Sequence, residues 1–365
     1  MDAEATTALR LTLVGPIPPP AGGMANQTAQ LKRLLEAQGV EVELVPVNPP
    51  YRPAFVASLP GLRAGVRLLA YLPSLWRAFG RGEVVHVMAN SGWSWHLFAA
   101  PAVLIARLRR RPVIVNYRGG EARSFLARQS GWVLPVLRRA NALIAPSGFL
   151  QALFTDYGLP AAVIPNIIDR TRFYPADISP AAPHLVVTRN LEPIYDIPTA
   201  LRAFAIVHRQ YPGARLSVAG SGPELARLEA LAETLGIGAA VRFCGRLEPD
   251  EMAGLYRRAS LMLNPSTVDN MPNSVLEAMA CGVPVVSTDV GGVPFIVSDG
   301  DTALLVPPRA PEAMAAAALR LLGEPGLAAG LRQRALAAVQ AYEWPVVKAQ
   351  WLGLYRELAG RHPPA

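Results

Sequence analysis

Short apolar segments alternate with stretches of helical periodicity along the whole chain, and this alternation constrains the fold more than any other feature. In the first half, strands are predicted at Leu9–Val14, Val40–Val45, Val84–Met88, Val113–Val115 and Ala142–Ala145. After a break at Asp177–Pro183 the pattern restarts, with strands predicted at Leu185–Val187, Leu216–Ala219, Val241–Phe243, Leu261–Leu263 and Val283–Ser287. Strands separated by helices favour parallel sheets with crossover helices. The sequence therefore predicts an α/β protein with two doubly wound domains, residues 1–168 and 181–345, that binds ligands beyond the carboxyl ends of its strands.

Composition excludes several classes of protein. Of the 365 residues, 51% are hydrophobic and 17% are charged, which excludes a disordered chain. The longest nearly uncharged apolar run, Trp93–Ala106, has 14 residues, fewer than the roughly 20 that span a bilayer. No cationic start precedes an apolar run, so no signal peptide is expected. Cys244 and Cys281 lack metal-ligand spacing and are too few for a disulfide scaffold. A cytoplasmic protein without a bound metal is expected.

The positive charge is concentrated in the first half of the chain. Residues 1–172 contain 19 basic and 9 acidic residues, against 16 and 18 in the remainder. This asymmetry favours an anionic partner, and because no basic-aromatic nucleic-acid motif is present, a membrane surface or a phosphorylated substrate is favoured. The segment Leu44–Gly82 has five arginines and no acidic residue, and its apolar residues at helical spacing include Leu59, Leu62, Val66, Leu69 and Leu72. Two interpretations remain open: an amphipathic helix for an anionic membrane, or an ordinary surface helix with solvated arginines.

The segment Asn264–Asp289 (NPSTVDNMPNSVLEAMACGVPVVSTD) carries the most chemical information. A polar loop follows a strand, and a helix is predicted over residues 274–280, with Asp269 in the loop and Glu277 in the first helical turn. The positive end of the helix dipole favours an anion such as a diphosphate, and the neighbouring carboxylates can accept hydrogen bonds from sugar hydroxyls. The alternative is that Ser274 and Glu277 form an S-x-x-E capping box with a purely structural role.

This segment resembles the donor-binding signature of the retaining glycosyltransferases of family 4, which have the GT-B fold. The family pattern is E-x7-E, with the second Glu in an LEAMA-GxPVV run; here Asp269 stands at the first position and Glu277 at the second. Further motifs in the family's order are Ser147–Phe149 with Tyr157–Gly158, Ile164–Asp169 with Phe173 and Pro175, Gly220–Glu224, Phe243–Gly245, Asp289–Pro294 and Tyr342–Trp344. The resemblance covers most of the chain and implies two Rossmann-like domains facing across a cleft, with a C-terminal helix, residues 346–361, packed back on the first domain.

The resemblance also implies roles for individual residues. Glu277 would hold the nucleotide ribose, and Asp269 would contact the transferred sugar. The other donor-binding positions that it implies are Gly22, Gly23, Asn190, Gly220, Arg246, Asn270, Met271, Pro272, Asn273 and Ser274. Gly22 and Gly23 would let the backbone approach the donor phosphates without a Cβ in the way, although a plain turn is an open alternative. For Gly220 a purely structural role in its turn is the stronger alternative.

Three positions depart from the family pattern. Relatives usually carry an Arg and a Lys after the first strand of the second domain, where Asn190 and Tyr195 stand here and Arg189 is displaced by one residue. Because a leaving diphosphate develops charge, a nearby cation is expected, and Arg189 is the first candidate and Arg246 the second. Arg118 stands where relatives often carry a His. An arginine cannot act as a base at neutral pH, but it can pair with phosphate, so Arg118 is a further candidate.

The resemblance predicts a retaining glycosyltransferase that moves a sugar from a UDP- or GDP-sugar to a hydroxyl of a glycan or polyprenyl-linked acceptor in bacterial polysaccharide or lipopolysaccharide synthesis. No protein nucleophile is evident, so we expect front-face attack assisted by the leaving phosphate, with catalysis by positioning and charge stabilisation. No metal, and no cofactor beyond the nucleotide-sugar, is expected. The protein would be cytoplasmic, or peripheral on the inner face of the plasma membrane.

Other classes of function are weighed against this one. A catalytically silent sugar-nucleotide-binding subunit and a GT-B nucleotide-sugar epimerase are the alternatives. A phosphorylase-like enzyme is disfavoured because the two lysines, Lys32 and Lys348, lie outside the predicted second-domain site. His86, at the end of a predicted buried strand, is expected to pack in the core.

Overall fold

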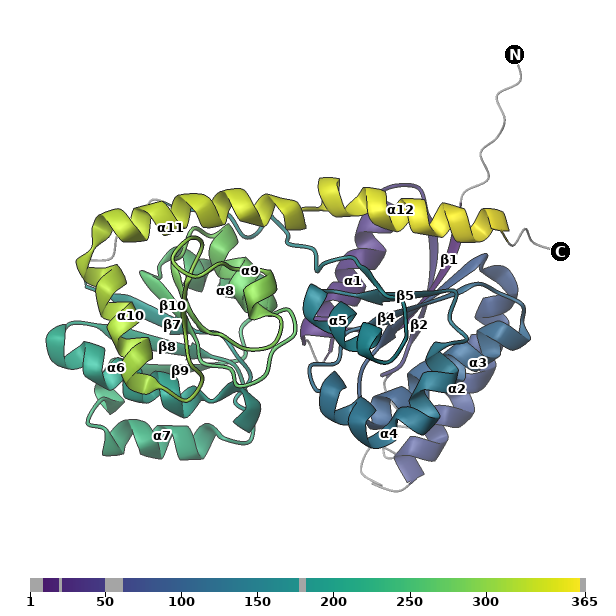
Figure 1. The fold of residues 1–365 in the computed structure, drawn as a ribbon. Helices are drawn as coiled ribbons and strands as arrows, with labels where there is room; N and C mark the ends of the chain where they lie inside the picture. The colour runs from purple at the N-terminus through teal and green to yellow at the C-terminus, as the bar shows by residue number, and fades with distance from the viewer. Residues whose placement is uncertain (1–8, 20–21, 50–61, 177–181, 362–365) are drawn as a thin grey trace, which may run out of the picture. The chain divides into compact units, whose positions relative to one another are not determined.

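The computed structural model describes residues 9–19, 22–49, 62–176 and 182–361 (Figure 1). The chain divides into two compact units, Met1–Ile167 with Val347–Ala365, and Ile168–Val346. Each unit contains one six-stranded sheet in which the paired strands are parallel. The predicted α/β class with two doubly wound parallel sheets is therefore confirmed. The predicted break at Asp177–Pro183 lies largely outside the described residues.

The sheet of the first unit has the strand order β2-β1-β3-β4-β5-β6. Its strands are β1 (Arg10–Gly15), β2 (Glu41–Pro46), β3 (Val84–Ala89), β4 (Val113–Tyr117), β5 (Ala142–Ala145) and β6 (Ala162–Val163). The helices that connect them are α1 (Gly23–Glu36), α2 (Leu62–Arg81), α3 (Ala100–Leu108), α4 (Ala122–Leu137) and α5 (Gly148–Asp156). Every residue of β3 and β4 is buried, as expected for inner strands of a parallel sheet that is covered on both faces.

The sheet of the second unit has the strand order β12-β11-β10-β7-β8-β9. Its strands are β7 (His184–Val187), β8 (Arg215–Ala219), β9 (Val241–Gly245), β10 (Leu261–Asn264), β11 (Val285–Thr288) and β12 (Leu304–Val306). Its helices are α6 (Ile197–Gln210), α7 (Leu225–Thr234), α8 (Pro249–Arg257), α9 (Asn273–Ala280), α10 (Pro311–Gly323) and α11 (Pro325–Ala338). Leu185 and Val187 of β7 belong to the core cluster with α6 and α10, whereas Val186 belongs to the cluster with α8 and α9. Alternate residues of one strand therefore supply cores on both faces of the sheet.

Helix α12 (Trp344–Arg361) belongs mainly to the first unit. Its Trp351 and Tyr355 rings stack with their centroids 5.7 Å apart, and the Tyr355 hydroxyl lies 2.8 Å from Nδ1 of His86 on β3. His86 is fully buried, in agreement with the predicted packing role, and burial lowers its pKa to about 3. The imidazole is therefore neutral and holds α12 against the sheet. Among the helices in the described ranges, none is both long and apolar enough to cross a bilayer.

Candidate active site

The candidate site lies where the strand order of the second sheet reverses. Strands β7, β8 and β9 succeed one another in one direction, whereas β10, β11 and β12 succeed one another in the other, so β7 and β10 are neighbours at the reversal. In open parallel sheets, ligands bind beyond the carboxyl ends of the strands at such a switch point. The loop after β7 carries Arg189 and the loop after β10 carries Asp269. The topology therefore brings together two predicted site residues that lie 80 positions apart.

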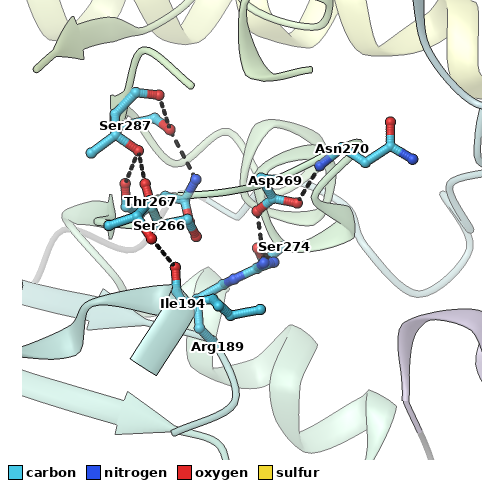
Figure 2. A network of polar contacts seen from close by, with 10 residues as sticks. Arg189, Ile194, Ser266, Thr267, Asp269, Asn270, Ser274 and Ser287 are labelled. Atoms are coloured by element: carbon cyan, nitrogen blue, oxygen red, sulfur yellow. Dashed lines mark hydrogen bonds and ion pairs between the residues drawn. The ribbon is translucent and has the colours of Figure 1, made fainter. Parts of the chain in front are cut away.

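Arg189 and Asp269 form a largely buried ion pair (Figure 2). Nη2 of Arg189 lies 2.6 Å from Oδ2 of Asp269, and the two side chains are only 11% and 9% exposed. Nη1 of Arg189 also donates to the Ser274 hydroxyl at 3.2 Å, and the guanidinium lies over the Tyr195 ring, 4.1 Å from its centroid. The backbone N–H of Asn270 donates to Oδ1 of Asp269 at 2.9 Å. Both oxygens of the Asp269 carboxylate thus accept a hydrogen bond.

A buried polar network fixes the loop that carries Asp269. Nδ2 of Asn264 donates to the Ser287 hydroxyl at 2.9 Å, and the Ser266 hydroxyl donates to Oδ1 of Asn264 at 2.9 Å. The Thr288 hydroxyl donates to the Ser266 carbonyl at 2.6 Å. These contacts join the ends of β10 and β11, so the loop leaves the sheet in a defined direction (Figure 2). Satisfied buried networks of this kind rigidify the groups that they connect.

Glu277 is the fifth residue of α9 and does not cap the helix. The capping-box alternative is wrong, because the N-cap position is Pro272 and no side-chain cap hydrogen bond is made there. The Glu277 carboxylate instead accepts a hydrogen bond from the Tyr256 hydroxyl of α8 at 3.3 Å. That hydroxyl also lies 2.6 Å from the Thr188 hydroxyl. A tertiary contact with a neighbouring helix has replaced the local partner that the S-x-x-E spacing indicated.

Both carboxyl groups of the candidate site have raised pKa values. Burial raises the pKa of Glu277 to about 7, although the Tyr256 hydrogen bond and the positive charge of Arg189 oppose the shift. Burial also raises the pKa of Asp269, against the opposing effects of Arg189 and the Asn270 N–H. Perturbed titratable groups that gather at one place mark functional sites. The two acids can therefore serve as hydrogen-bond acceptors whose charge depends on a bound cation or ligand.

Two glycines allow the close backbone approaches on which the site depends. Gly291 has φ +54°, and a Cβ there would lie 2.0 Å from the carbonyl oxygen of Asp269. Gly220 has φ +155°, and a Cβ there would lie 2.0 Å from the carbonyl oxygen of Arg189. The turn at Gly220 thus packs directly against the segment that carries Arg189. This close packing explains why a glycine is required at position 220. Gly291 was not among the predicted site residues, although it lies in a motif that the sequence identified.

The remaining predicted residues occupy varied positions. Asn270, Met271 and Ser274 are buried around the start of α9, with Pro272 at its N-cap and Asn273 as its first residue. Asn190 and Arg246 are exposed at the ends of β7 and β9. In the first unit, Gly22 and Gly23 begin α1, and a Cβ at Gly22 would meet nothing within 4 Å. Packing therefore does not require a glycine at position 22.

Arg118 lies in the first unit, just beyond β4. Its Nη1 donates to Oδ1 of Asn166, and its Nε is buried without a hydrogen-bond partner. Burial lowers the pKa of Arg118 to about 10, and the positive charge of Arg118 contributes to the low pKa of His86. A buried guanidinium whose described partner is an amide retains its full positive charge at neutral pH. Its predicted role toward a phosphate stays a prediction.

Comparison with known proteins assigns the family. A model described as Glycosyltransferase Family 4 matches residues 21–172, and a model described as Glycosyl transferases group 1 matches residues 182–324. The chain belongs to the family 4, group 1 glycosyltransferases. The Anabaena protein HepE in complex with UDP and glucose superimposes with a TM-score of 0.75 at 17% identity, over 96% of this chain and 100% of that one. The chain therefore has the GT-B fold, as predicted.

Curated relatives of this glycosyltransferase chain have several different names. A phosphatidyl-myo-inositol mannosyltransferase of Mycolicibacterium smegmatis is 27% identical over 93% of this chain and 91% of its own length. A D-inositol 3-phosphate glycosyltransferase of Acidothermus cellulolyticus is 34% identical over 56% of this chain and 49% of its own length. An exopolysaccharide phosphotransferase of Streptomyces coelicolor is 35% identical over 55% of this chain but 21% of its own length. The matches to this phosphotransferase and to two D-inositol 3-phosphate glycosyltransferases thus span between 21% and 49% of those relatives' lengths.

Two side chains of the site were not predicted from any sequence motif. Tyr256 contacts Glu277 from another helix, and Tyr195 lies under the guanidinium of Arg189. The sequence marks Tyr195 only as the residue that stands at the family's lysine position, and no motif includes Tyr256. A search for aromatic residues in the segments after β7 and before β10 would have found both.

Proposed function

We propose that the chain is a retaining glycosyltransferase that transfers a sugar from a nucleoside diphosphate sugar to a hydroxyl of a glycan or lipid-linked acceptor. The observation that carries the proposal is the arrangement of Arg189, Asp269 and Glu277 around the first turns of α9, at the switch point of the second sheet. The site offers a cation, two carboxylates and the positive end of a helix dipole. These are the groups that a diphosphate, a sugar and a ribose require.

The three residues would have different roles toward the donor. Arg189 would meet the diphosphate and stabilise the charge that develops as it leaves. Asp269 would accept a hydrogen bond from a hydroxyl of the donor sugar, and Glu277 would accept hydrogen bonds from the ribose. The acceptor hydroxyl would attack the anomeric carbon from the face that the diphosphate leaves, passing its proton to a leaving phosphate oxygen. Rate enhancement would come from positioning and from the fixed positive charge.

Uracil is the base that the similar structures favour. HepE has been solved with UDP and glucose and also with UDP-glucose, at 17% identity to this chain. A UDP-sugar is therefore the first donor to test. Bacterial polysaccharide or lipopolysaccharide synthesis remains the proposed setting, with the acceptor carried on a lipid.

An exposed apolar and basic surface on α2 and α3 supports a lipid-linked acceptor. Leu69, Leu72 and Trp76 are 76%, 39% and 47% exposed and lie at helical spacing on α2. On α3, Leu104 and Leu108 are 40% and 72% exposed. The exposed Arg77 and Arg107 lie on the same two helices, and between residues 44 and 120 the sequence has a single acidic residue, Glu83. Apolar side chains among arginines match the interface of an anionic membrane.

A thermal-shift screen tests the donor assignment. UDP-, GDP-, ADP- and dTDP-sugars would be added at millimolar concentration, and binding to the native state raises the melting temperature by mass action. Donor hydrolysis in the absence of acceptor, measured by nucleotide release and lost in Glu277→Ala, distinguishes a transferase from a silent binding subunit. An epimerase would instead release a changed sugar. No stabilisation by any of the four donors would contradict the proposal.

Vesicle sedimentation tests the acceptor side. We expect the protein to bind vesicles containing phosphatidylglycerol more strongly than purely zwitterionic vesicles. Replacement of Trp76 and Leu108 by Ser should reduce that binding several-fold, because each loses apolar contact with the interface. The control is Phe295→Ser, a 54% exposed aromatic residue of the second unit. Equal vesicle binding by the wild type and the double variant would refute this surface as the membrane contact.

A further inference from the structure

One N–H donor of the Arg189 guanidinium, at Nε, has no hydrogen-bond partner. Its Nη2 contacts Asp269, its Nη1 contacts Ser274, and one face lies 4.1 Å from the centroid of the Tyr195 ring. The Nε of Arg189 is buried and has no hydrogen-bond partner. An arginine has five N–H donors in one plane, and leaving one unpaired in a buried place is unfavourable. A ligand with anionic oxygens, such as a phosphate, would provide a hydrogen-bond acceptor for this donor.

The segment that carries Arg189 and Tyr195 is anchored at several points. The Leu191 N–H donates to the Ser221 carbonyl at 3.0 Å, just beyond the close approach of Gly220 to Arg189. At the other end, the Ile194 carbonyl accepts hydrogen bonds from both the N–H and the hydroxyl of Thr267, at 2.8 and 2.9 Å (Figure 2). Thr267 lies two residues before Asp269, so the Tyr195 ring and the Asp269 carboxylate are held in one framework.

An aromatic ring holds a cation differently from a carboxylate. The ring face attracts the guanidinium but occupies none of its in-plane N–H donors, so those donors stay available. The Asp269 carboxylate, by contrast, occupies one of them directly. A planar guanidinium can turn over the ring while it remains in contact with it. The Tyr195 contact is therefore compatible with an additional anion, whereas the Asp269 contact competes with one.

We propose that Tyr195 is a positioning residue for Arg189, and that Arg189 exchanges Asp269 for the donor diphosphate when the nucleotide binds. This inference rests on the proposed function. The Arg189–Asp269 ion pair neutralises both largely buried groups. On binding, the Arg189 donors turn to the phosphate oxygens over the Tyr195 face, and the Asp269 carboxylate becomes free for a donor-sugar hydroxyl. One arginine on an aromatic face would then serve where relatives use two cations.

Isothermal titration with UDP and UMP, and in parallel with GDP and GMP, tests the exchange at pH 8. The ratio of diphosphate to monophosphate affinity isolates the outer phosphate from the base and ribose. In Arg189→Gln this ratio should fall close to one. In Tyr195→Ala the diphosphate affinity should fall about three- to tenfold, the size of a partly buried cation–π contact, with little change for the monophosphate. Tyr195→Phe keeps the ring and should restore the wild-type ratio.

Asp269→Asn gives the most discriminating result. Removing the competing charge should raise UDP affinity about threefold or more, while a UDP-sugar should lose its advantage over UDP. A merely structural role for the ion pair predicts weaker UDP binding instead, and that outcome would overturn the exchange. Unchanged diphosphate ratios in Tyr195→Ala would overturn the positioning role, even where Asp269→Asn is too unstable to test. Failure of the wild type to bind any of these nucleotides would reject the proposed function itself.

Discussion

Replacing Tyr256 by Phe removes one hydroxyl from the centre of the second unit. That hydroxyl lies 2.6 Å from the Thr188 hydroxyl, 3.2 Å from the Ser274 carbonyl and 3.3 Å from the Glu277 carboxylate. The Tyr256 side chain is fully buried, and burial together with the nearby Glu277 charge raises its pKa well above the ordinary value. The phenol is therefore protonated at neutral pH, and it can donate only one hydrogen bond at a time.

The magnitude follows from the groups left behind. A neutral hydrogen bond contributes about 0.5–1.5 kcal/mol, and a buried group left without a partner costs about 1–3 kcal/mol. These contributions share one hydroxyl and do not add, so we expect Tyr256→Phe to lower the free energy of unfolding by about 1–3 kcal/mol. For a unit of this size, that corresponds to a fall of about 2–12 °C in Tm. Tyr174→Phe, at an exposed tyrosine, is the matched control.

Tyr256→Phe should also change the pH dependence of donor binding. Glu277 accepts ribose hydrogen bonds best as a carboxylate, and its pKa is raised to about 7, so affinity for a nucleotide-sugar should rise with pH through about 7. The Tyr256 hydrogen bond lowers this pKa, and its loss should move the midpoint to higher pH. The diphosphate of a nucleotide-sugar is esterified at both ends and does not titrate in this range.

The folding equilibrium provides an independent test with the opposite sign. A carboxyl whose pKa is higher in the folded protein binds more protons there, so its stabilising contribution is complete below the unfolded value, about 4.5, and is lost as pH rises toward 7. Glu277→Gln should abolish both this fall in stability and the rise in donor affinity. Calorimetry and titration between pH 5.5 and 8.5 measure the two. A Tyr256→Phe protein with wild-type Tm and an unshifted midpoint would refute the reasoning.

Two further substitutions test the supports of the fold and the site. Gly291→Ala would place a Cβ 2.0 Å from the Asp269 carbonyl oxygen at φ +54°, so it should cost about 2–4 kcal/mol of stability and abolish donor binding. Gly300→Ala, at φ +69° in open space, should cost only about 1 kcal/mol and preserve donor binding; equal effects in calorimetry would argue against the close approach. Tyr355→Phe should leave Nδ1 of His86 unpaired, cost about 1–3 kcal/mol and speed hydrogen exchange within residues 344–361. Unchanged exchange there would argue against a role of the His86–Tyr355 contact in holding α12 on the sheet.

The sequence predicted the strands that have enough buried residues to form a pattern. β3 (Val84–Ala89) is apolar except for the buried His86, so both its position and its central place in the sheet could be predicted. β6 and β12 have two and three residues, too few to show a period. The start of α7 at Leu225 has a tertiary cause, because the N–H of the preceding residue, Glu224, donates to the Leu191 carbonyl.

The sequence pointed to Asp269, Glu277 and Arg189 as candidate site residues, but it did not predict Tyr256 or the contacts between residues of different elements. Asp269 and Glu277 are eight positions apart, and their spacing identifies them. Their partners Arg189 and Tyr256 are 80 and 21 positions away, and only the folded sheet brings them near. The capping-box alternative failed for the same reason, because a local pattern cannot show that Tyr256 supplies a competing hydrogen bond.

The displacement of Arg189 by one residue illustrates what a sequence pattern can and cannot decide. Within a strand, a shift of one position turns a side chain to the opposite face of the sheet, so an arginine displaced by one residue could not reach the same site. β7, however, ends at Val187, so Arg189 lies in the following loop, where that alternation no longer applies. Its guanidinium reaches Asp269 and Tyr195 from there. The missing Arg/Lys pair therefore gives no support of its own to a silent binding subunit, because a cation one residue away still lies at the switch point.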